Sequence, residues 1–341
     1  MRAWQTVRAG RPGEALELNE KAETPRPGPG TIGLEVIAAG LGLPDALMCQ
    51  GSYALTPTLP FTQGQEVVGR IVSLGPDVEN RRLGERVMAG SSFFTGDGSC
   101  AEQCLALDDF CLPVPDGMSD AEAAGFLIPM HTAYIGLVRR AQLAAGETLL
   151  VLGGAGGTGS AALQLGRALG ARVITTAGGP DKAEFCRALG AHDVIDYHTE
   201  DIAPRVRELT RGAGAQVVYD PVGGSAFRSA TRCVSHEGRI LMVGFGGGSW
   251  GQVESAHLVS RNYSVLGVIP SHYDRAFKEA AQERLVDLWR QGQIRIPIDT
   301  LVPFESLPEA LEKLQAGRVR GKLVLAVDSD ATAPIGTSTT L

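Results

Sequence analysis

The amino-acid sequence predicts an α/β protein of two domains, one β-rich and one built on a doubly wound parallel sheet. Three observations carry this prediction: the chain length, the β-type texture of residues 1–124, and the alternation of β-type and helical runs that follows. The chain has 341 residues. Because a single hydrophobic core stops growing at roughly 250 to 300 residues, we expect two cores.

The first domain is predicted from short apolar runs separated by Gly and Pro, such as "EVVGRIVSLG" and "GERVMAG". Runs of roughly four to eight residues with this punctuation are typical of strands joined by tight turns. The texture becomes helical over residues 119–143, where Ser119 or Asp120 is a candidate N-cap. We therefore end the first segment of this domain at residue 124.

The second domain is predicted from the alternation over residues 125–265. Connections that contain a helix are too long for hairpins, so they indicate βαβ units and a parallel sheet, here of about six strands. Residues 266–330 add two helical runs and the strand-like "GKLVLAV", and we expect them to return to the first domain. Residues 331–341 are polar and without periodicity, which predicts a disordered tail.

Charge and composition exclude several classes of function. The chain carries 31 basic and 38 acidic residues, a formal net charge of −7, without a basic run of the kind that nucleic acid needs. The N-terminal residues lack a secretory apolar segment, and no run of the length of a membrane span is apolar throughout. Six cysteines without a CxxC pair predict free thiols in a reducing compartment. We therefore expect a cytoplasmic protein that binds neither membrane nor nucleic acid.

A glycine-rich turn is the strongest functional signal. The stretch "VLGGAGGTG" places a GxGxxG pattern between a β-type run and a helical run. Its first glycine permits a tight turn, its second lets the backbone approach a pyrophosphate, and its third lets the helix pack on the strand. We expect a dinucleotide here, with a plain packing turn as the alternative. The turn residues assigned to the cofactor are Gly154, Gly156, Gly157, Thr158 and Gly159.

The end of the next β-type run predicts which dinucleotide binds. In proteins that bind NAD, an acidic residue at this point holds the ribose 2′-hydroxyl. Here "RVITTA" is followed by no carboxylate until Asp181, and Lys182 comes next. A cation without a neighbouring strand-end acid favours a 2′-phosphate, so we expect NADPH. The alternative is that Lys182 is only a solvated residue of a first helical turn.

Several stretches together make the chain resemble the zinc-independent NADPH:quinone oxidoreductase branch of the medium-chain dehydrogenase/reductase superfamily. They include "AAGLGLPDALMCQGSY", "LPFTQGQEVVGRIVSLG", "GETLLVLGGAGGTGSAALQLGRALGARVI" and "VVYDPVGG". The resemblance extends from "MRAW" to "GKLVL". It implies a GroES-like β-barrel domain, a Rossmann cofactor domain and a substrate cleft between them. It also implies a homodimer, because relatives pair the strand that corresponds to "SVLGVI" across a two-fold axis.

The resemblance also implies two parts of the NADPH site. It assigns the 2′-phosphate to the end of the second β-type run and the following turn, and the nicotinamide half to residues dispersed along the domain. The residues for the 2′-phosphate are Gly178, Lys182 and Tyr197, and those for the nicotinamide half are Thr132, Val222, Gly244, Phe245 and Gly246. Gly179 is also assigned to the cofactor.

The same comparison implies a reaction without a metal. Metal-dependent members carry a cysteine where this chain has Gly42 and a histidine where it has Gln65. Hydride addition to a quinone or an α,β-unsaturated carbonyl needs orientation and hydrogen bonding rather than a Lewis acid. We therefore expect an NADPH-dependent reductase of such small molecules. Branch members usually carry asparagine at the position of Gly42, and this departure leaves the quinone preference open.

Three side chains are candidates for catalysis, and each has a structural alternative. Tyr53 is a candidate donor to the reduced oxygen or a packed aromatic, and Gln65 is an amide donor or a mere replacement for a lost ligand. Asp45 is an orienting group or a turn residue. Two other functions stay open: an enoyl or acryloyl thioester reductase, and a catalytically inactive NADPH-binding protein with a structural or regulatory role.

Overall fold

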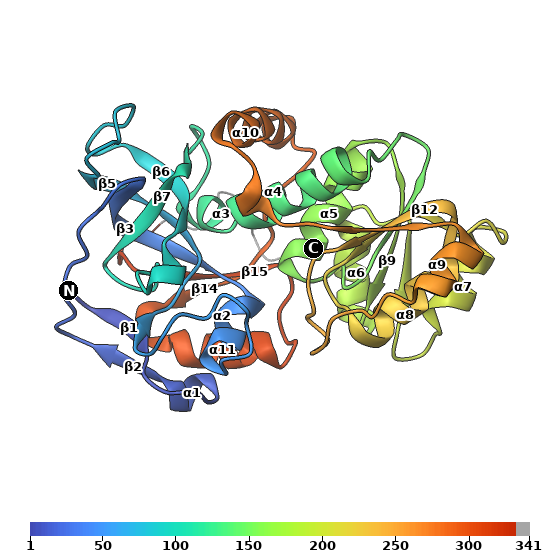
Figure 1. Cartoon of the computed structure of the whole chain (residues 1–341), viewed down its shortest axis with the longest axis horizontal. Coiled ribbons are helices and arrows are strands. Elements are labelled where there is room, and N and C mark those ends of the chain that lie inside the picture. The colour runs from blue at the N-terminus through green and yellow to red at the C-terminus, as the bar shows by residue number, and fades with distance from the viewer. Residues whose placement is uncertain (332–341) are drawn as a thin grey trace. The chain divides into compact units, whose positions relative to one another are not determined.

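The computed structural model describes residues 1–331 and divides into two compact units, shown in Figure 1. Unit 1 contains Met1–Ile128, Asp274–Glu279 and the described residues from Ile296 onward. Unit 2 contains Pro129–Tyr273 and Ala280–Arg295. One unit is built on antiparallel strands and the other on a parallel sheet, which confirms the predicted α/β fold class.

The predicted domain limits stay predictions. The predicted domains, 1–124 with 266–330 and 125–265, have other bounds than the two units of the structure. The tail predicted over 331–341 lies outside the described residues, apart from Ala331.

Unit 1 is organised around its longest strand, β3 (Thr31–Leu41), which pairs antiparallel with three others. Two of them, β5 (Glu66–Leu74) and β7 (Gln103–Pro113), are also joined to each other through β6 (Arg86–Ser91). These four strands therefore close into a barrel. Repeated short strands with tight turns explain the punctuated texture of the sequence.

Two strands from the C-terminal part of the chain extend this sheet. β15 (Lys322–Ala326) pairs with β3, and β14 (Ile298–Pro303) pairs with β15. The remaining elements of unit 1 are a small sheet of order β2-β1-β4 and short helices. They are β1 (Ala3–Thr6), α1 (Pro12–Ala15), β2 (Leu16–Asn19), α2 (Leu43–Cys49), β4 (Phe61–Thr62), α3 (Asp120–Ala124) and α11 (Leu307–Gln315).

Unit 2 contains a six-stranded sheet of order β10-β9-β8-β11-β12-β13, and every neighbouring pair is parallel. The predicted sheet of about six strands is thus confirmed. The chain order reverses between β8 and β11, which is where open α/β sheets bind ligands beyond the carboxyl ends of their strands. The strands are β8 (Thr148–Val151), β9 (Arg172–Ala177), β10 (Asp193–Asp196), β11 (Ala215–Asp220), β12 (Val234–Met242) and β13 (Ser264–Gly267).

Helices connect these strands and cover the sheet, so its central strands are almost entirely buried. One core lies under α7 and α8 and includes Leu150, Ile174, Val218 and Phe227. The helices are α4 (Leu127–Tyr134), α5 (Gly157–Ala168), α6 (Pro180–Ala188), α7 (Ile202–Leu209), α8 (Gly224–Cys233), α9 (Ser255–Arg261) and α10 (Arg275–Arg290).

The helical run expected over residues 119–143 is interrupted. Its N-cap is confirmed, since the Ser119 hydroxyl accepts the Glu122 N–H. The helix then stops at Gly125, where an added Cβ would lie 3.1 Å from the Ile296 side chain. When the chain resumes as α4, the Ile128 N–H is donated to the carboxylate of Glu66 at 2.8 Å. Tertiary packing and a distant acceptor therefore break a segment that is helical by local pattern.

The helix α10 is divided between the two units. Its first turn belongs to unit 1, where Lys278 forms an ion pair with Asp109 at 2.9 Å. Its remainder belongs to unit 2, where Gln282 is hydrogen-bonded to His131 at 2.9 Å. That bond makes His131 a buried helical histidine with a structural partner. Nowhere in residues 1–331 is a helix both long enough and apolar enough to cross a bilayer.

Candidate functional site

The glycine turn joins β8 to α5, and three of its glycines are required by the protein's own packing. Gly153 has φ +65°, a conformation that side chains with a Cβ rarely adopt. An added Cβ would lie 2.1 Å from the Thr175 hydroxyl at Gly154 and 2.2 Å from the Gly153 carbonyl oxygen at Gly159. These glycines let strand and helix approach closely.

Gly156 is a glycine for a different reason. It is exposed, its φ of −83° suits any residue, and an added Cβ would meet only the Gly153 carbonyl oxygen at an ordinary 3.5 Å. As the N-cap of α5 it precedes the first N–H groups of the helix, which have no acceptor within the helix. Those N–H groups and the helix dipole favour an anion. The turn therefore fits a pyrophosphate that approaches the backbone at Gly156.

A second group of predicted residues meets at the end of β9. An added Cβ on Gly178 would lie 2.5 Å from the Tyr197 hydroxyl oxygen and 2.7 Å from His198 Nε2. The rings of Tyr197 and His198 are 4.8 Å apart. Sequence reasoning missed His198, although it directly follows Tyr197. The structure thus brings two polar side chains to the position that the missing side chain of Gly178 leaves open.

Asp196 connects the turns that carry these residues. Its Oδ1 accepts the N–H of Gly179 and the N–H of His198, both at 3.0 Å. The first of these bonds and then the second lower the pKa of the Asp196 carboxyl. Gly179 itself has φ +83°, and Lys182 follows in the first turn of α6. Asp196 was also missed, because its role depends on the pairing of β10 with β9.

The loops after β11 and β12 lie together and border the glycine turn. The Gly246 N–H is donated to the Pro221 carbonyl oxygen at 2.9 Å, and the Gly247 N–H to that of Val222 at 2.8 Å. An added Cβ on Gly153 would lie 3.1 Å from Val222 Cγ2. The predicted residues Val222 and Gly246 are therefore neighbours.

Phe245 and Thr132 are also predicted for the nicotinamide half. Phe245 stacks on the exposed Trp250, with ring centroids 4.8 Å apart. Thr132 lies instead within α4 and is 6% exposed. A further residue, Asp220, was missed: its carboxylate accepts the N–H groups of Val222 and Gly223, both at 2.8 Å. It shapes the loop that carries Val222.

Unit 1 contains the three residues predicted for catalysis. Asp45 lies in α2 and is 1% exposed. Its Oδ2 accepts the Gly42 N–H at 2.8 Å, while its Oδ1 is buried and makes no hydrogen bond within the described part of the chain. Burial raises the pKa of Asp45 to about 6. Asp45 is therefore a carboxyl group that can hold a proton close to neutral pH.

Tyr53 and Gln65 are close to Asp45. Burial raises the pKa of the Tyr53 phenol and the negative charge of Asp45 adds to the effect, whereas the Gln65 side chain lowers this pKa. Tyr53 follows α2 and is half-buried. The three side chains thus form one cluster of donors and a proton-holding acid.

A buried ion pair that sequence reasoning missed lies beside this cluster. Lys322 Nζ is 3.0 Å from Glu66 Oε2, and both side chains are buried. The charge of Lys322 lowers the pKa of Asp45, whereas that of Glu66 raises it. Glu66 was visible as an acid inside the apolar run that follows Gln65, but its partner is distant in the sequence.

Two positions at this cluster offer no ligand of the kind that zinc prefers. Gly42 has no side chain, and the amide of Gln65 is not among the thiolate, imidazole and carboxylate groups that zinc prefers. In the described range 1–331, no three His, Cys, Asp or Glu residues are arranged to hold a metal ion. All six cysteines are free thiols and buried.

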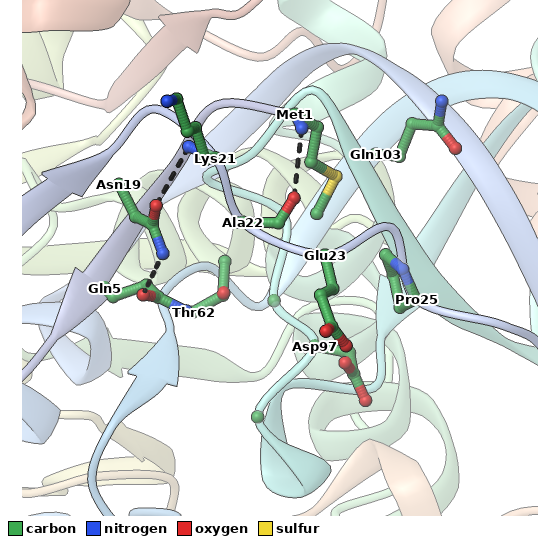
Figure 2. A pocket seen from close by; sticks show the side chains of 12 residues that line it. Met1, Gln5, Asn19, Lys21, Ala22, Glu23, Pro25, Thr62, Asp97 and Gln103 are labelled. Carbon is green, nitrogen blue, oxygen red and sulfur yellow. Dashed lines mark hydrogen bonds between the residues drawn. The ribbon is translucent and has the colours of Figure 1, made fainter.

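A separate polar pocket of about 350 Å³ lies at the small sheet of unit 1 (Figure 2). Three hydrogen bonds join residues of its lining: Asn19 donates to Gln5 and accepts the Lys21 N–H, and the Met1 amine donates to the Ala22 carbonyl oxygen. None of the predicted site residues lines this pocket. It gives no indication of a ligand.

Two family models match the chain. Residues 28–133 match the alcohol dehydrogenase GroES-like domain, and residues 157–286 match the zinc-binding dehydrogenase domain. The first match covers barrel strands of unit 1, and the second begins at the first residue of α5. The name of the second model describes the family and does not assign a metal to this chain.

Relatives match over nearly the whole chain. A quinone oxidoreductase of Pseudomonas aeruginosa is 33% identical, with 92% of this chain and 95% of the relative covered. A quinone oxidoreductase-like protein 2 homolog of Nematostella vectensis is 30% identical, with 95% and 89% covered. Among solved structures, a mycobacterial protein complexed with NADPH matches with a TM-score of 0.89 and 29% identity, with 96% of this chain and 100% of that chain covered.

Proposed function

Because the chain belongs to the quinone oxidoreductase branch of the medium-chain dehydrogenase/reductase superfamily, we propose that it is an NADPH-dependent, metal-independent reductase of quinones or α,β-unsaturated carbonyls. One observation carries the proposal. Gly156 is a glycine that the fold does not need, placed at the N-terminus of α5 where a pyrophosphate requires close approach to the backbone.

The preference for NADPH over NADH is proposed from the end of β9. The strand ends at Ala177, and Gly178 beside it presents no carboxylate to a ribose 2′-hydroxyl. Instead, the Tyr197 hydroxyl lies next to Gly178, and Lys182 follows in α6. Hydrogen-bond donors and a cation suit a 2′-phosphate.

Bound NADPH supplies the hydride for the reaction. The residues of unit 1 are then proposed to handle the acceptor's oxygen and the proton. Tyr53 donates a hydrogen bond to the oxygen on which negative charge develops, and the Gln65 side chain, which lowers the pKa of that phenol, assists it. Asp45, with its unpaired Oδ1 and a pKa of about 6, holds the proton that completes the reduction. One hydride and one proton together make the two-electron reduction of an alkene or a quinone.

Two further parts of the proposal concern the surroundings of the reaction. The buried free cysteines are consistent with a reducing, cytoplasmic compartment. β13 is the last strand of the sheet in unit 2, and its open edge supports a homodimer that pairs this strand with its copy. A molar mass measured by light scattering would decide between monomer and dimer.

The function is tested by following NADPH oxidation with three acceptors: a naphthoquinone, a 2-enal and an enoyl thioester. We expect turnover of the quinone or the enal, little turnover with NADH, and no effect of a chelator. Tyr53→Phe and Asp45→Asn should each lower kcat by about a hundredfold while NADPH still binds. Turnover of the thioester alone would reassign the substrate class, and tight NADPH binding without any turnover would favour a non-enzymatic role. Chelator inhibition that zinc reverses would refute the metal-free reaction.

A further inference from the structure

Two polar side chains converge on one small space at the carboxyl end of β9. The Tyr197 hydroxyl oxygen and His198 Nε2 both lie within 2.7 Å of the point that a Cβ on Gly178 would occupy. Tyr197 is 49% exposed and His198 is exposed, so both reach solvent and are accessible to a ligand. Because Gly178 has no side chain, both polar groups can lie against its backbone at the end of β9.

The topology of unit 2 identifies what this space faces. β8 and β9 are the first two strands of the sheet in chain order, and the glycine turn follows β8. In a doubly wound dinucleotide-binding sheet, the end of the second strand reaches the 2′-position of the adenosine ribose. The two donors at Gly178 therefore lie where NADPH and NADH differ.

We propose that His198 is a direct ligand of the 2′-phosphate and a determinant of the preference for NADPH; this inference rests on the proposed function. A phosphate monoester offers three strong acceptor oxygens and close to two negative charges. His198 Nε2–H and the Tyr197 hydroxyl both donate toward it, and the Lys182 ammonium adds charge. Charge-assisted hydrogen bonds of this kind are shorter and stronger than neutral ones.

Asp196 acts as a positioning residue for this site. Its Oδ1 accepts the N–H of His198 on one side and the N–H of Gly179 on the other. It thereby fixes the backbone that carries the imidazole beside the turn that carries Gly178. The charge of Asp196 alone would repel a phosphate, so its positioning role and its charge affect binding in opposite directions.

The inference is tested with His198→Ala, His198→Arg and the control His236→Ala, which removes another exposed histidine of unit 2. Calorimetry measures the Kd of NADPH, NADH, adenosine 2′,5′-bisphosphate and AMP. We expect His198→Ala to weaken NADPH and the bisphosphate about tenfold. NADH and AMP should change less than twofold, His198→Arg should restore the affinity, and the control should change none of the four.

Asp196→Asn and Asp196→Ala separate position from charge. The amide oxygen of asparagine can still accept both N–H groups without a negative charge, so Asp196→Asn should bind NADPH at least as tightly as the wild type. Asp196→Ala removes both bonds and should weaken NADPH about tenfold despite the loss of a repulsive charge. If both variants tighten binding equally, Asp196 acts through charge alone and the positioning role is refuted.

The outcomes distinguish this inference from the proposed function. A wild-type protein that binds NADPH and NADH equally would overturn the proposed cofactor preference itself. A wild-type protein that prefers NADPH, with His198→Ala keeping the full preference, would overturn only the role of His198. Thermal unfolding of each variant checks its fold, and the gain of affinity expected in His198→Arg relative to His198→Ala is independent of any general destabilisation.

Discussion

The two units build their candidate sites from different parts of the chain. In unit 2 the turns after parallel strands present backbone N–H groups, and the site depends on side chains that are missing, at Gly156 and Gly178. In unit 1 the site depends on charged side chains that are buried, above all Asp45 and its neighbour Glu66. A site made of backbone N–H groups therefore does not lower the folding stability of its unit, whereas a site made of buried charges does.

The sharpest way to test the backbone site is to add a methyl group at two glycines of the same turn. At Gly159 the new Cβ would overlap the Gly153 carbonyl oxygen at 2.2 Å, so Gly159→Ala should destabilise unit 2 by about 3 kcal/mol and abolish NADPH binding. At Gly156 the new Cβ meets nothing closer than 3.5 Å. The free energy of unfolding of Gly156→Ala should therefore stay within about 0.5 kcal/mol of the wild-type value.

The two variants are compared by thermal unfolding and by calorimetry with NADPH. Gly156→Ala should fold normally and still lose about thirtyfold or more in NADPH affinity, since its methyl group takes the space of the pyrophosphate, equivalent to about 2 kcal/mol. Unchanged affinity in Gly156→Ala would mean that no ligand approaches the backbone at this residue.

The buried-charge site should show the opposite pattern, a variant that gains stability. Asp45 has a pKa of about 6 in the folded protein against an ordinary 3.8, a difference that corresponds to about 3 kcal/mol. Folding stability therefore falls as the pH rises from about 4 to about 6, because the folded state binds the Asp45 proton more tightly than the unfolded state does. Above about pH 6 this loss of stability is complete.

Asp45→Asn removes this loss and keeps an acceptor for the Gly42 N–H. Since its buried NH2 group gains no partner and costs about 1 kcal/mol, we expect a net gain of about 2 kcal/mol at pH 7.5. Below about pH 4, where Asp45 is protonated in the folded and unfolded states alike, the gain should turn into a loss of about 1 kcal/mol. Unfolding followed over pH 4 to 8 measures the difference, and a gain that does not depend on pH would show that Asp45 is not the ionised group responsible.

The comparison also explains which features could be predicted from the sequence. The parallel sheet, the glycine turn and the Ser119 N-cap follow from patterns within a few residues, because strand and helix periods and capping are local. In the same way, the missing acid after β9 was visible directly. Backbone sites of this kind can therefore be predicted from short patterns in the sequence.

Features that depend on distant residues could not be predicted. The partner of Glu66 is Lys322, 256 residues away, and Glu66 also holds Ile128 at the break between α3 and α4. The position of His198 depends on the pairing of β10 with β9 and on the hydrogen bonds of Asp196. No periodicity in the sequence specifies such contacts. The cluster around Asp45 in unit 1 could therefore be predicted only in part.

The backbone site of unit 2 also uses a charged side chain, that of Lys182. Reversing its charge in Lys182→Glu places a carboxylate near the proposed 2′-phosphate, and NADPH should bind about a hundredfold more weakly, equivalent to about 2.7 kcal/mol. NADH should change less than threefold because it has no phosphate there. Arg187→Glu makes the same charge change on the same helix, on a side chain that is 53% exposed, and should alter neither Kd more than threefold. An equal loss for both nucleotides in Lys182→Glu would remove this residue from the phosphate site and leave the glycine turn as the part of unit 2 that binds the cofactor.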